Sequence, residues 1–274
     1  MTGIRSLLVQ LDDAPASAMR LARAVSLTRV HRAALAAMAV MSPQLESPAL
    51  AFTEIPAASL DSHDDAQAHA RIRVRFDEIA SGLTPMAHWL DGGADAAGEF
   101  RHQALCADLM VLGPHDPETP GRVQAPPDFV ETMLLTAGKP ALVLPSWTSG
   151  SVGRRVLIGW NASVPAARAV QAALPWLAVA TSVHVLESSD ARSTTGARAL
   201  DLFGYLRLHG IAAERLRPGR GADAGAMLLE RAAELGSDLL VMGCYGHGRL
   251  REFVLGGATR KVLAELPLPV LMAH

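Results

Sequence analysis

The stretch Ser237-Asp-Leu-Leu-Val-Met-Gly243 has the same pattern as an earlier stretch, Ala107-Asp-Leu-Met-Val-Leu-Gly113. Each copy places an acidic residue before a short apolar run and closes the run with a glycine. Such a run is too short for a helix and is typical of a buried strand. A second matching pair is formed by Lys139-Pro-Ala-Leu-Val-Leu144 and Leu268-Pro-Val-Leu-Met272. The chain therefore contains two tandem copies of one structural unit.

Candidate strands and helices alternate through both copies, which favours a parallel sheet with helices on both faces and right-handed crossovers. The strands predicted in the first copy span residues 4–11, 33–41, 86–90, 108–113 and 140–145, with helices at 18–29, 61–81, 95–106 and 128–136. The strands predicted in the second copy span residues 155–160, 182–186, 212–216, 238–242 and 268–272, with helices at 166–177, 195–209, 222–235 and 258–266. The expected fold class is α/β, with two tandem open, doubly wound parallel five-stranded sheet domains.

A stretch rich in serine and glycine, Ser146-Trp-Thr-Ser-Gly-Ser-Val-Gly153, separates the two copies near the middle of the chain. This composition is typical of a linker between domains. We therefore expect a first domain at residues 1–146, a linker at 147–153 and a second domain at 154–274.

Glycines cluster after the fourth predicted strand of the second copy, at positions 243, 246 and 248 and again at 256 and 257. A glycine loop exposes backbone N–H groups, and the helix predicted to follow it adds partial positive charge at its N-terminus, so the loop is a candidate anion site, most simply for phosphate. In a doubly wound sheet, ligands bind beyond the carboxyl ends of the strands where the strand order reverses. That rule places the turn at Asn161 and the loop at Gly243 on the same edge of the sheet.

Composition and motifs exclude several classes of protein. The 274 residues carry a net charge of −2 with no basic tail, which argues against nucleic-acid binding. Two cysteines, Cys106 and Cys244, cannot form a disulfide framework. Residues 1–13 do not have the pattern that we expect of a secretory signal, and no apolar run is long enough to span a membrane. We expect a cytoplasmic protein without membrane contact. Histidine and cysteine spacings do not match a metal site, and the common hydrolase, P-loop and dinucleotide motifs are absent.

The spacing of Gly243, Gly246 and Gly256 resembles the glycine pattern of universal stress proteins in their ATP-binding class. The resemblance extends over nearly the whole chain as two family domains with an adenine nucleotide alpha hydrolase-like fold, but the glycine motif is intact only in the second copy. Two positions depart from the family pattern. Gly257 stands where the family has Ser or Thr, with Thr259 two positions on, and Asn161 stands where family members place an aspartate that contacts adenine.

The resemblance implies a stress-response regulatory or sensor protein that binds ATP, or ADP or AMP, in its second domain, with or without Mg. It places the nucleotide against residues of that domain, namely Trp160, Asn161, Ser163, Val185, Met242, Gly243, Gly246, His247, Arg249, Gly256, Gly257, Ala258 and Thr259. Because family dimers pair their last strands, it also implies that the two domains pair within one chain. Association of two chains as a homodimer stays open.

The first copy lacks the glycine motif, because Pro114-His-Asp-Pro-Glu-Thr-Pro-Gly121 follows its strand. Prolines remove N–H donors and acidic side chains repel phosphate, so we expect no nucleotide phosphate site there. Its Asp12 occupies the position at which the family places the adenine-contacting aspartate, but an acid at a strand end is also a common helix cap.

Two other functions remain open at this point. The chain can be a nucleotide-free interaction or scaffold protein whose loops have decayed, which the replacements at Gly257 and Asn161 favour. It can also be a slow ATPase, although phosphoryl transfer needs a metal-binding carboxylate near the γ-phosphate and Glu252 is the only acid within the loop. The residues do not require catalysis, so a non-enzyme is the preferred reading.

Overall fold

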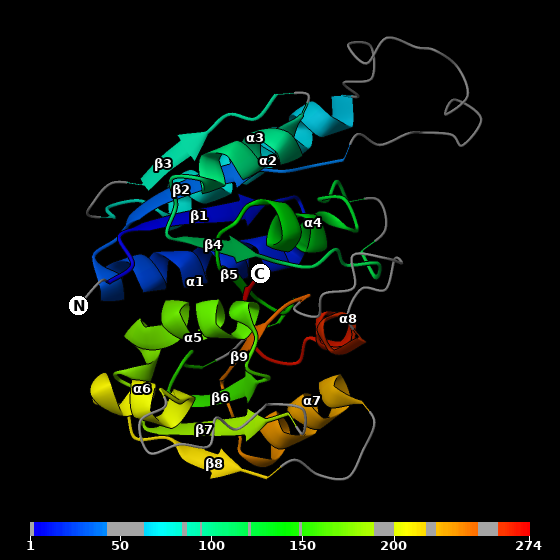
Figure 1. Cartoon of the computed structure of the whole chain (residues 1–274). Coiled ribbons are helices and arrows are strands. Elements are labelled where there is room, and N and C mark those ends of the chain that lie inside the picture. The colour runs from blue at the N-terminus through cyan, green and yellow to red at the C-terminus, as the bar shows by residue number, and fades with distance from the viewer. Residues whose placement is uncertain are drawn as a thin grey trace. The chain divides into compact units, whose positions relative to one another are not determined.

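The computed structural model describes residues 3–42, 63–83, 87–93, 95–119, 122–147, 150–188, 200–217, 223–245 and 257–274. These residues form two compact units, at 3–139 and at 140–274. Each unit is an α/β layered structure (Figure 1).

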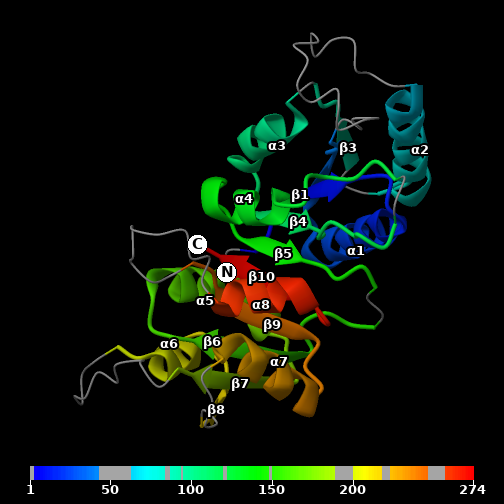
Figure 2. The same ribbon diagram turned by 90° about the vertical axis from the view of Figure 1, so that its right-hand side faces the viewer.

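The unit at residues 3–139 is built on four parallel strands in the order β3-β2-β1-β4. Its elements are β1 (Ser6–Leu11), α1 (Pro15–His31), β2 (Ala34–Ala39), α2 (His63–Ile79), β3 (Ala87–Leu90), α3 (Ala96–Ala104), β4 (Leu109–Leu112) and α4 (Phe129–Thr136). Figure 2 shows α1 and α2 on one face of these strands and α3 and α4 on the other. The right-handed crossovers through α1 and α2 lead outward from β1 to β3, whereas the crossover through α3 leads back past β1 to β4, so these helices lie on opposite faces.

The unit at residues 140–274 repeats this order and adds two strands, giving β5-β10-β9-β6-β7-β8. Its elements are β5 (Ala141–Val143), β6 (Arg155–Trp160), α5 (Val164–Leu177), β7 (Ser182–Glu187), α6 (Leu202–Leu208), β8 (Glu214–Leu216), α7 (Ala224–Glu234), β9 (Leu239–Gly243), α8 (Gly257–Glu265) and β10 (Val270–Ala273). All pairs are parallel except β5 with β10, which is antiparallel. Helices α5 and α6 cover one face, and α7 and α8 the other (Figure 2).

The acidic residue that opens the repeated stretch has a structural role in both units. The Asp108 carboxylate accepts hydrogen bonds from the backbone N–H groups of Arg5 at 2.7 Å and Ser6 at 3.0 Å, just where β1 begins. Asp238 accepts in the same way from the N–H groups of Arg154 at 3.2 Å and Arg155 at 2.8 Å, at the start of β6. Each acid therefore fixes the start of the neighbouring strand.

The central strands are buried on both faces, which explains why they read as continuous apolar runs rather than alternating patterns. Every residue of β4, β5 and β10 is buried, as are the first four residues of β9. No helix in the described ranges is long and apolar enough to cross a membrane.

The predicted fold class is confirmed, with five strands in each sequence copy. The prediction of a helix over 195–209 is wrong at its start. Residues 195–199 lie outside the described part of the chain, and α6 begins only at Leu202, because the Asp201 side chain accepts a hydrogen bond from the Gly204 N–H at 2.6 Å and caps the helix there.

Candidate functional site

The strand order of the second unit reverses at β6, which lies between β7 and β9. Both neighbours are parallel to β6, and Gly159 lies opposite Met242 in the register with β9. The carboxyl ends of β6 and β9 therefore meet at one edge, with Asn161 and Gly243 beside each other in the topology. This is the switch point at which open α/β sheets bind ligands.

The turn after β6 is ordered by Asn161 and Ser163. The Asn161 side-chain oxygen accepts hydrogen bonds from the backbone N–H of Ser163 at 3.3 Å and from its hydroxyl at 2.7 Å. The Ser163 hydroxyl in turn accepts from the Ala166 N–H at 3.3 Å and caps α5. The acceptor oxygen of Asn161 is thus already used inside the turn.

Gly243 ends β9 against the first turn of α5. A Cβ atom at this position would lie 2.4 Å from the backbone nitrogen of Ala166 and 2.7 Å from the carbonyl carbon of Pro165. Glycine therefore permits the close approach of the strand end to the helix N-terminus. This packing role explains the glycine without any ligand.

The residues after Gly243 are held by the end of β10. The N–H of Cys244 donates to the carbonyl of Ala273 at 2.9 Å, and Nδ1 of His274 lies 3.1 Å from the Cys244 carbonyl oxygen. Burial raises the pKa of the Cys244 thiol to about 12, so the thiol stays protonated at neutral pH. Cys244 therefore lies in the core, and its backbone holds the end of β9 against β10.

Two residues without glycine's freedom adopt left-handed backbone conformations at this edge. Ala162, after β6, has φ of 56°, and Tyr245, after β9, has φ of 55°. Left-handed φ is unfavourable for residues with a side chain, and such strain clusters at ligand-binding sites. The corresponding residues of the first unit, Asp13 and His115, do not have positive φ. The strain marks the second unit's switch point as the candidate site.

Helix α8 begins at Gly257 and lies between the parallel strands β9 and β10 in the chain, so its N-terminus lies toward the carboxyl ends of these strands. Gly257 is exposed and a Cβ atom there would meet nothing within 4 Å, whereas Thr259 is only 3% exposed. The first turn contains no acidic residue. The backbone N–H groups of Gly257 and Ala258 thus form a positive helix end that suits an anion, and the buried Thr259 side chain is less well placed to replace a missing hydroxyl.

The other predicted site residues differ in how deeply their side chains are buried. Val185 and Met242 are buried in their strands, whereas Trp160 is half-buried at the end of β6. Gly246, His247, Arg249 and Gly256 lie outside the described residues. In the parts of the chain that the structure describes, no group of three or more His, Cys, Asp or Glu side chains could hold a metal ion.

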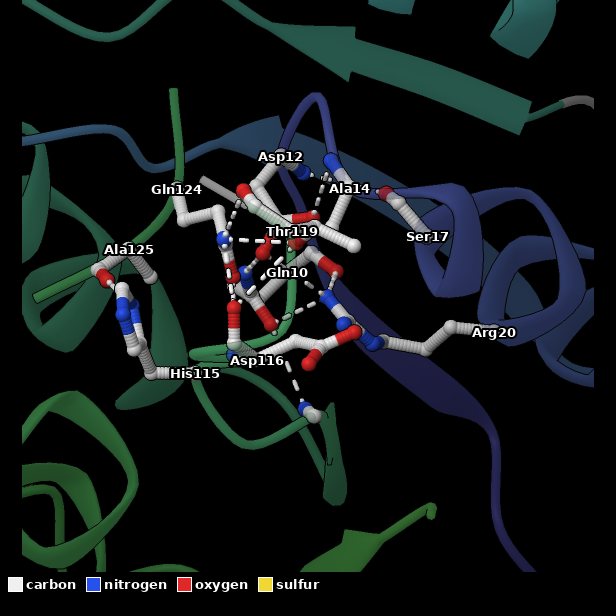
Figure 3. Close-up of polar contacts among 11 residues, drawn as sticks. Gln10, Asp12, Ala14, Ser17, Arg20, His115, Asp116, Thr119, Gln124 and Ala125 are labelled. Carbon is white, nitrogen blue, oxygen red and sulfur yellow. Dashed lines mark hydrogen bonds and ion pairs between the residues drawn. The ribbon is translucent and has the colours of Figure 1, made fainter. Parts of the chain in front are cut away.

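The corresponding edge of the first unit is filled by its own polar side chains (Figure 3). Arg20 is 3% exposed, and its guanidinium donates to the Gln10 backbone oxygen at 2.8 Å and to the Gln10 side-chain oxygen. That side-chain oxygen also accepts from the Gly113 N–H at 3.2 Å, and Asp12 lies 3.6 Å from Arg20. A Cβ atom on Gly113 would lie 2.2 Å from the guanidinium. The arginine therefore occupies the switch point itself.

The segment after Gly113 closes over this network. Gln124 ties the segment together, accepting from the Asp116 N–H at 2.8 Å and donating to the Thr119 hydroxyl at 2.9 Å (Figure 3). The Asp13 N–H donates to the Val123 carbonyl at 3.0 Å, which joins the segment to the end of β1. In this unit, the loop is shaped by side chains of the chain itself.

Asp13 is buried beside two half-exposed arginines. Its carboxylate lies 2.8 Å from Arg71 and 3.2 Å from Arg122. Burial favours a higher pKa for Asp13, but the hydrogen bonds and positive charges of the two arginines outweigh it and hold the pKa below its usual value.

Residues 153–274 match the universal stress protein family. The C-terminal half of the chain belongs to the universal stress protein family. No curated protein matches the chain.

Solved structures extend the likeness in fold to the whole chain. A universal stress protein from Archaeoglobus fulgidus is 17% identical with a TM-score of 0.69, over 98% of this chain and 97% of that one. A functionally unknown protein from Pseudomonas aeruginosa is 17% identical with a TM-score of 0.61, over 98% of this chain and 92% of that one. At these identities the likeness establishes the fold alone.

Sequence reasoning missed the residues that separate the two halves. Gln10 within an apolar strand and Arg20 on the buried side of a helix were the available signals, because isolated polar residues in apolar patterns are buried only when they are paired. The strain at Ala162 and Tyr245 had no sequence signal, since neither residue type favours left-handed backbone.

Proposed function

We propose that this protein is a stress-response regulatory or sensor module that binds ATP, or a related adenine nucleotide, in its C-terminal universal stress protein domain. The observation that carries the proposal is which residues lie at the switch point between β6 and β9. At the equivalent switch point, between β1 and β4, the first half has a buried arginine network. The second half has small residues and a helix N-terminus instead.

The geometry supplies distinct groups for the two ends of a nucleotide. Asn161 and Trp160 lie at the end of β6, where a base and ribose would rest, and the N–H groups of Gly257 and Ala258 begin α8, where phosphates would bind. The glycine loop between them, including Gly246, His247, Arg249 and Gly256, is proposed to complete the phosphate contacts.

In this proposal, Mg²⁺ binds to the protein only together with the nucleotide phosphates. Mg²⁺ keeps several waters and binds to nucleotide phosphates with one or two carboxylates. The described residues offer no cluster of acidic ligands, so the fit depends on the nucleotide itself. Catalysis is not part of the proposal.

We also propose that the two sequence copies pair within the chain through their last strands. The antiparallel register Val270↔Val143, Leu271↔Leu142 and Met272↔Ala141 supports this, because it joins the strand that ends the first copy to the strand that ends the second. A cytoplasmic location and the absence of nucleic-acid partners stay predictions from the sequence.

Calorimetric titration of the full chain with ATP, ADP and AMP tests the function. We expect saturable binding of at least one of them, and nucleotide retained by the purified protein. If none binds at millimolar concentration, the function is wrong and the scaffold alternative replaces it. Steady release of ADP or AMP would instead favour the slow ATPase.

A further inference from the structure

We propose that His274 is a positioning residue for the candidate site of the second half, because it holds Cys244 and Tyr245, the two residues that follow β9, in a fixed conformation. The inference rests on the proposed function, since it names a residue that supports the same site. It follows from contacts among three elements of the second unit, and from the different residues at the equivalent place in the first unit.

The conformation of Tyr245 needs support from its surroundings. Its φ of 55° lies in the left-handed region, which is unfavourable for a residue with a large side chain. Strained residues of this kind persist only where the contacts around them fix the backbone. The contacts made by Cys244 and Tyr245 therefore show what holds the chain at the point where it leaves β9.

His274 contacts both of these residues. The N–H of Cys244 donates to the Ala273 carbonyl at 2.9 Å, which continues the pairing of β9 with β10. Nδ1 of His274 lies 3.1 Å from the Cys244 carbonyl oxygen, and Nδ1 is the donor because a carbonyl oxygen only accepts. The His274 ring also lies edge-on to the Tyr245 ring, with the two centroids 6.3 Å apart. His274 thus holds the peptide group between Cys244 and Tyr245 and the side chain that follows it.

His274 is itself held by α5. The Arg168 side chain, on that helix, donates from Nη1 to the His274 backbone oxygen at 2.7 Å. The first turn of the same helix packs against Gly243 at the end of β9. Three elements, α5, β9 and β10, are therefore joined at the carboxyl edge of the sheet, beside the switch point.

The first half has different residues at both ends of this contact. The repeat places Pro114 where the second half has Cys244, and Pro145 where it has His274. A proline nitrogen carries no hydrogen and its ring is no donor, so neither of the two hydrogen bonds can form there. His115, in the place of the strained tyrosine, does not have positive φ. The half in which we expect no phosphate site thus lacks both the strained residue and the groups that hold it.

The test combines two measurements in one parent protein, the full chain with Cys106→Ser, in which Cys244 is the only thiol. Cys244 is buried, and burial raises the pKa of its thiol to about 12, so a disulfide reagent such as DTNB reacts with it only when the end of β9 opens. The rate of this reaction at neutral pH measures the opening without any nucleotide. Calorimetric titrations with ATP, ADP and AMP measure the site.

Three variants of the parent separate the role of the imidazole donor from a general effect on the fold. His274→Ala removes the donor and the ring, so we expect a thiol reaction about threefold faster and nucleotide binding about threefold weaker. His274→Asn keeps an N–H donor close to the place of Nδ1 and should return both values to within about twofold of the parent. The matched control His209→Ala removes another exposed histidine that contacts a tyrosine ring, that of Tyr205 at 4.7 Å, and should change neither value. Circular dichroism melts check that each variant is folded.

The outcomes separate the inference from the function beneath it. A faster thiol reaction and weaker binding in His274→Ala, both restored in His274→Asn, support the inference. If His274→Ala reacts at the parent rate, or reacts faster but binds nucleotide as tightly as the parent, the inference is overturned and nucleotide binding stands. An asparagine variant that behaves like the alanine variant also overturns it, because the donor would then not be the cause. If the parent binds none of the three nucleotides, the proposed function fails and the inference fails with it.

Discussion

The two halves of the chain share a fold and differ at the place where that fold binds ligands. Val9 of β1 lies opposite Val111, and Ile158 of β6 lies opposite Val241. Val111 and Val241 hold the same place in the repeated stretch, so Gln10 corresponds to Gly159. Each helix begins four residues beyond its strand, so Arg20 corresponds to Ala169.

This alignment shows that the two switch points share a topology and differ in the side chains that lie there. In the first half a glutamine, an aspartate and an arginine satisfy one another and fill the edge. In the second half the glutamine and arginine are replaced by glycine and alanine, and the aspartate by an asparagine that holds its own turn.

Removing the arginine should break the first half most severely. Arg20→Ala leaves Asp12 and the Gln10 oxygen buried without their cationic partner, and we expect a loss of about 3–5 kcal/mol in the free energy of unfolding. Hydrogen exchange of β1 and β4 amides measures this loss in the first half separately.

The control for that experiment is the double variant Arg20→Leu with Asp12→Asn. It removes both charges and keeps the volume, so it should cost less than Arg20→Ala alone. A single variant that is as stable as wild type would show that the network does not hold this edge together.

The second half should be most sensitive at Gly243. Gly243→Ala drives a Cβ atom into the backbone of Ala166, which cannot rotate away, so we expect a loss of about 1–3 kcal/mol and weaker nucleotide binding. Gly257→Ala adds the same methyl group in open space and should change the free energy of unfolding by less than about 0.5 kcal/mol. Urea unfolding and ATP titration of both variants compare them; equal effects would contradict the packing role.

Acid should weaken the first half through Asp13. Its folded pKa is below its unfolded value of about 4, so its contribution to stability is present above that value and is lost as pH falls through the folded pKa. Asp13→Asn should cost about 1–2 kcal/mol at pH 7, since the two arginines are half-exposed, and much less at pH 2. Urea unfolding at both pH values measures the difference, and a cost that does not depend on pH would argue against the ion pairs.

Relief of backbone strain should have the smallest effect. Ala162→Gly removes the left-handed penalty but makes the unfolded chain more flexible, so we expect a gain of about 0.5 kcal/mol. Ala14→Gly in the first half, where φ is −68°, should instead lose stability. Thermal melts compare the two, and a loss in both would mean that Ala162 is not strained.

The repeat made the fold predictable, because each copy carries the acid, the apolar run and the glycine that place its strands. Helix ends were harder to predict where a cap decides them: Asp201 accepts a hydrogen bond from the Gly204 N–H, so α6 begins only at Leu202, later than predicted. The edge at Asn161 and Gly243 followed from strand order. The arginine that fills the first half did not, because its partners come together only in three dimensions.

The measurement that tests the account most directly is the stoichiometry of nucleotide binding by the full chain, with variants in each half. We predict one ATP site per chain, unchanged in Arg20→Leu with Asp12→Asn and weakened in Gly243→Ala. Two sites per chain, or one site lost with the first-half variant and kept with the second-half variant, would contradict the account.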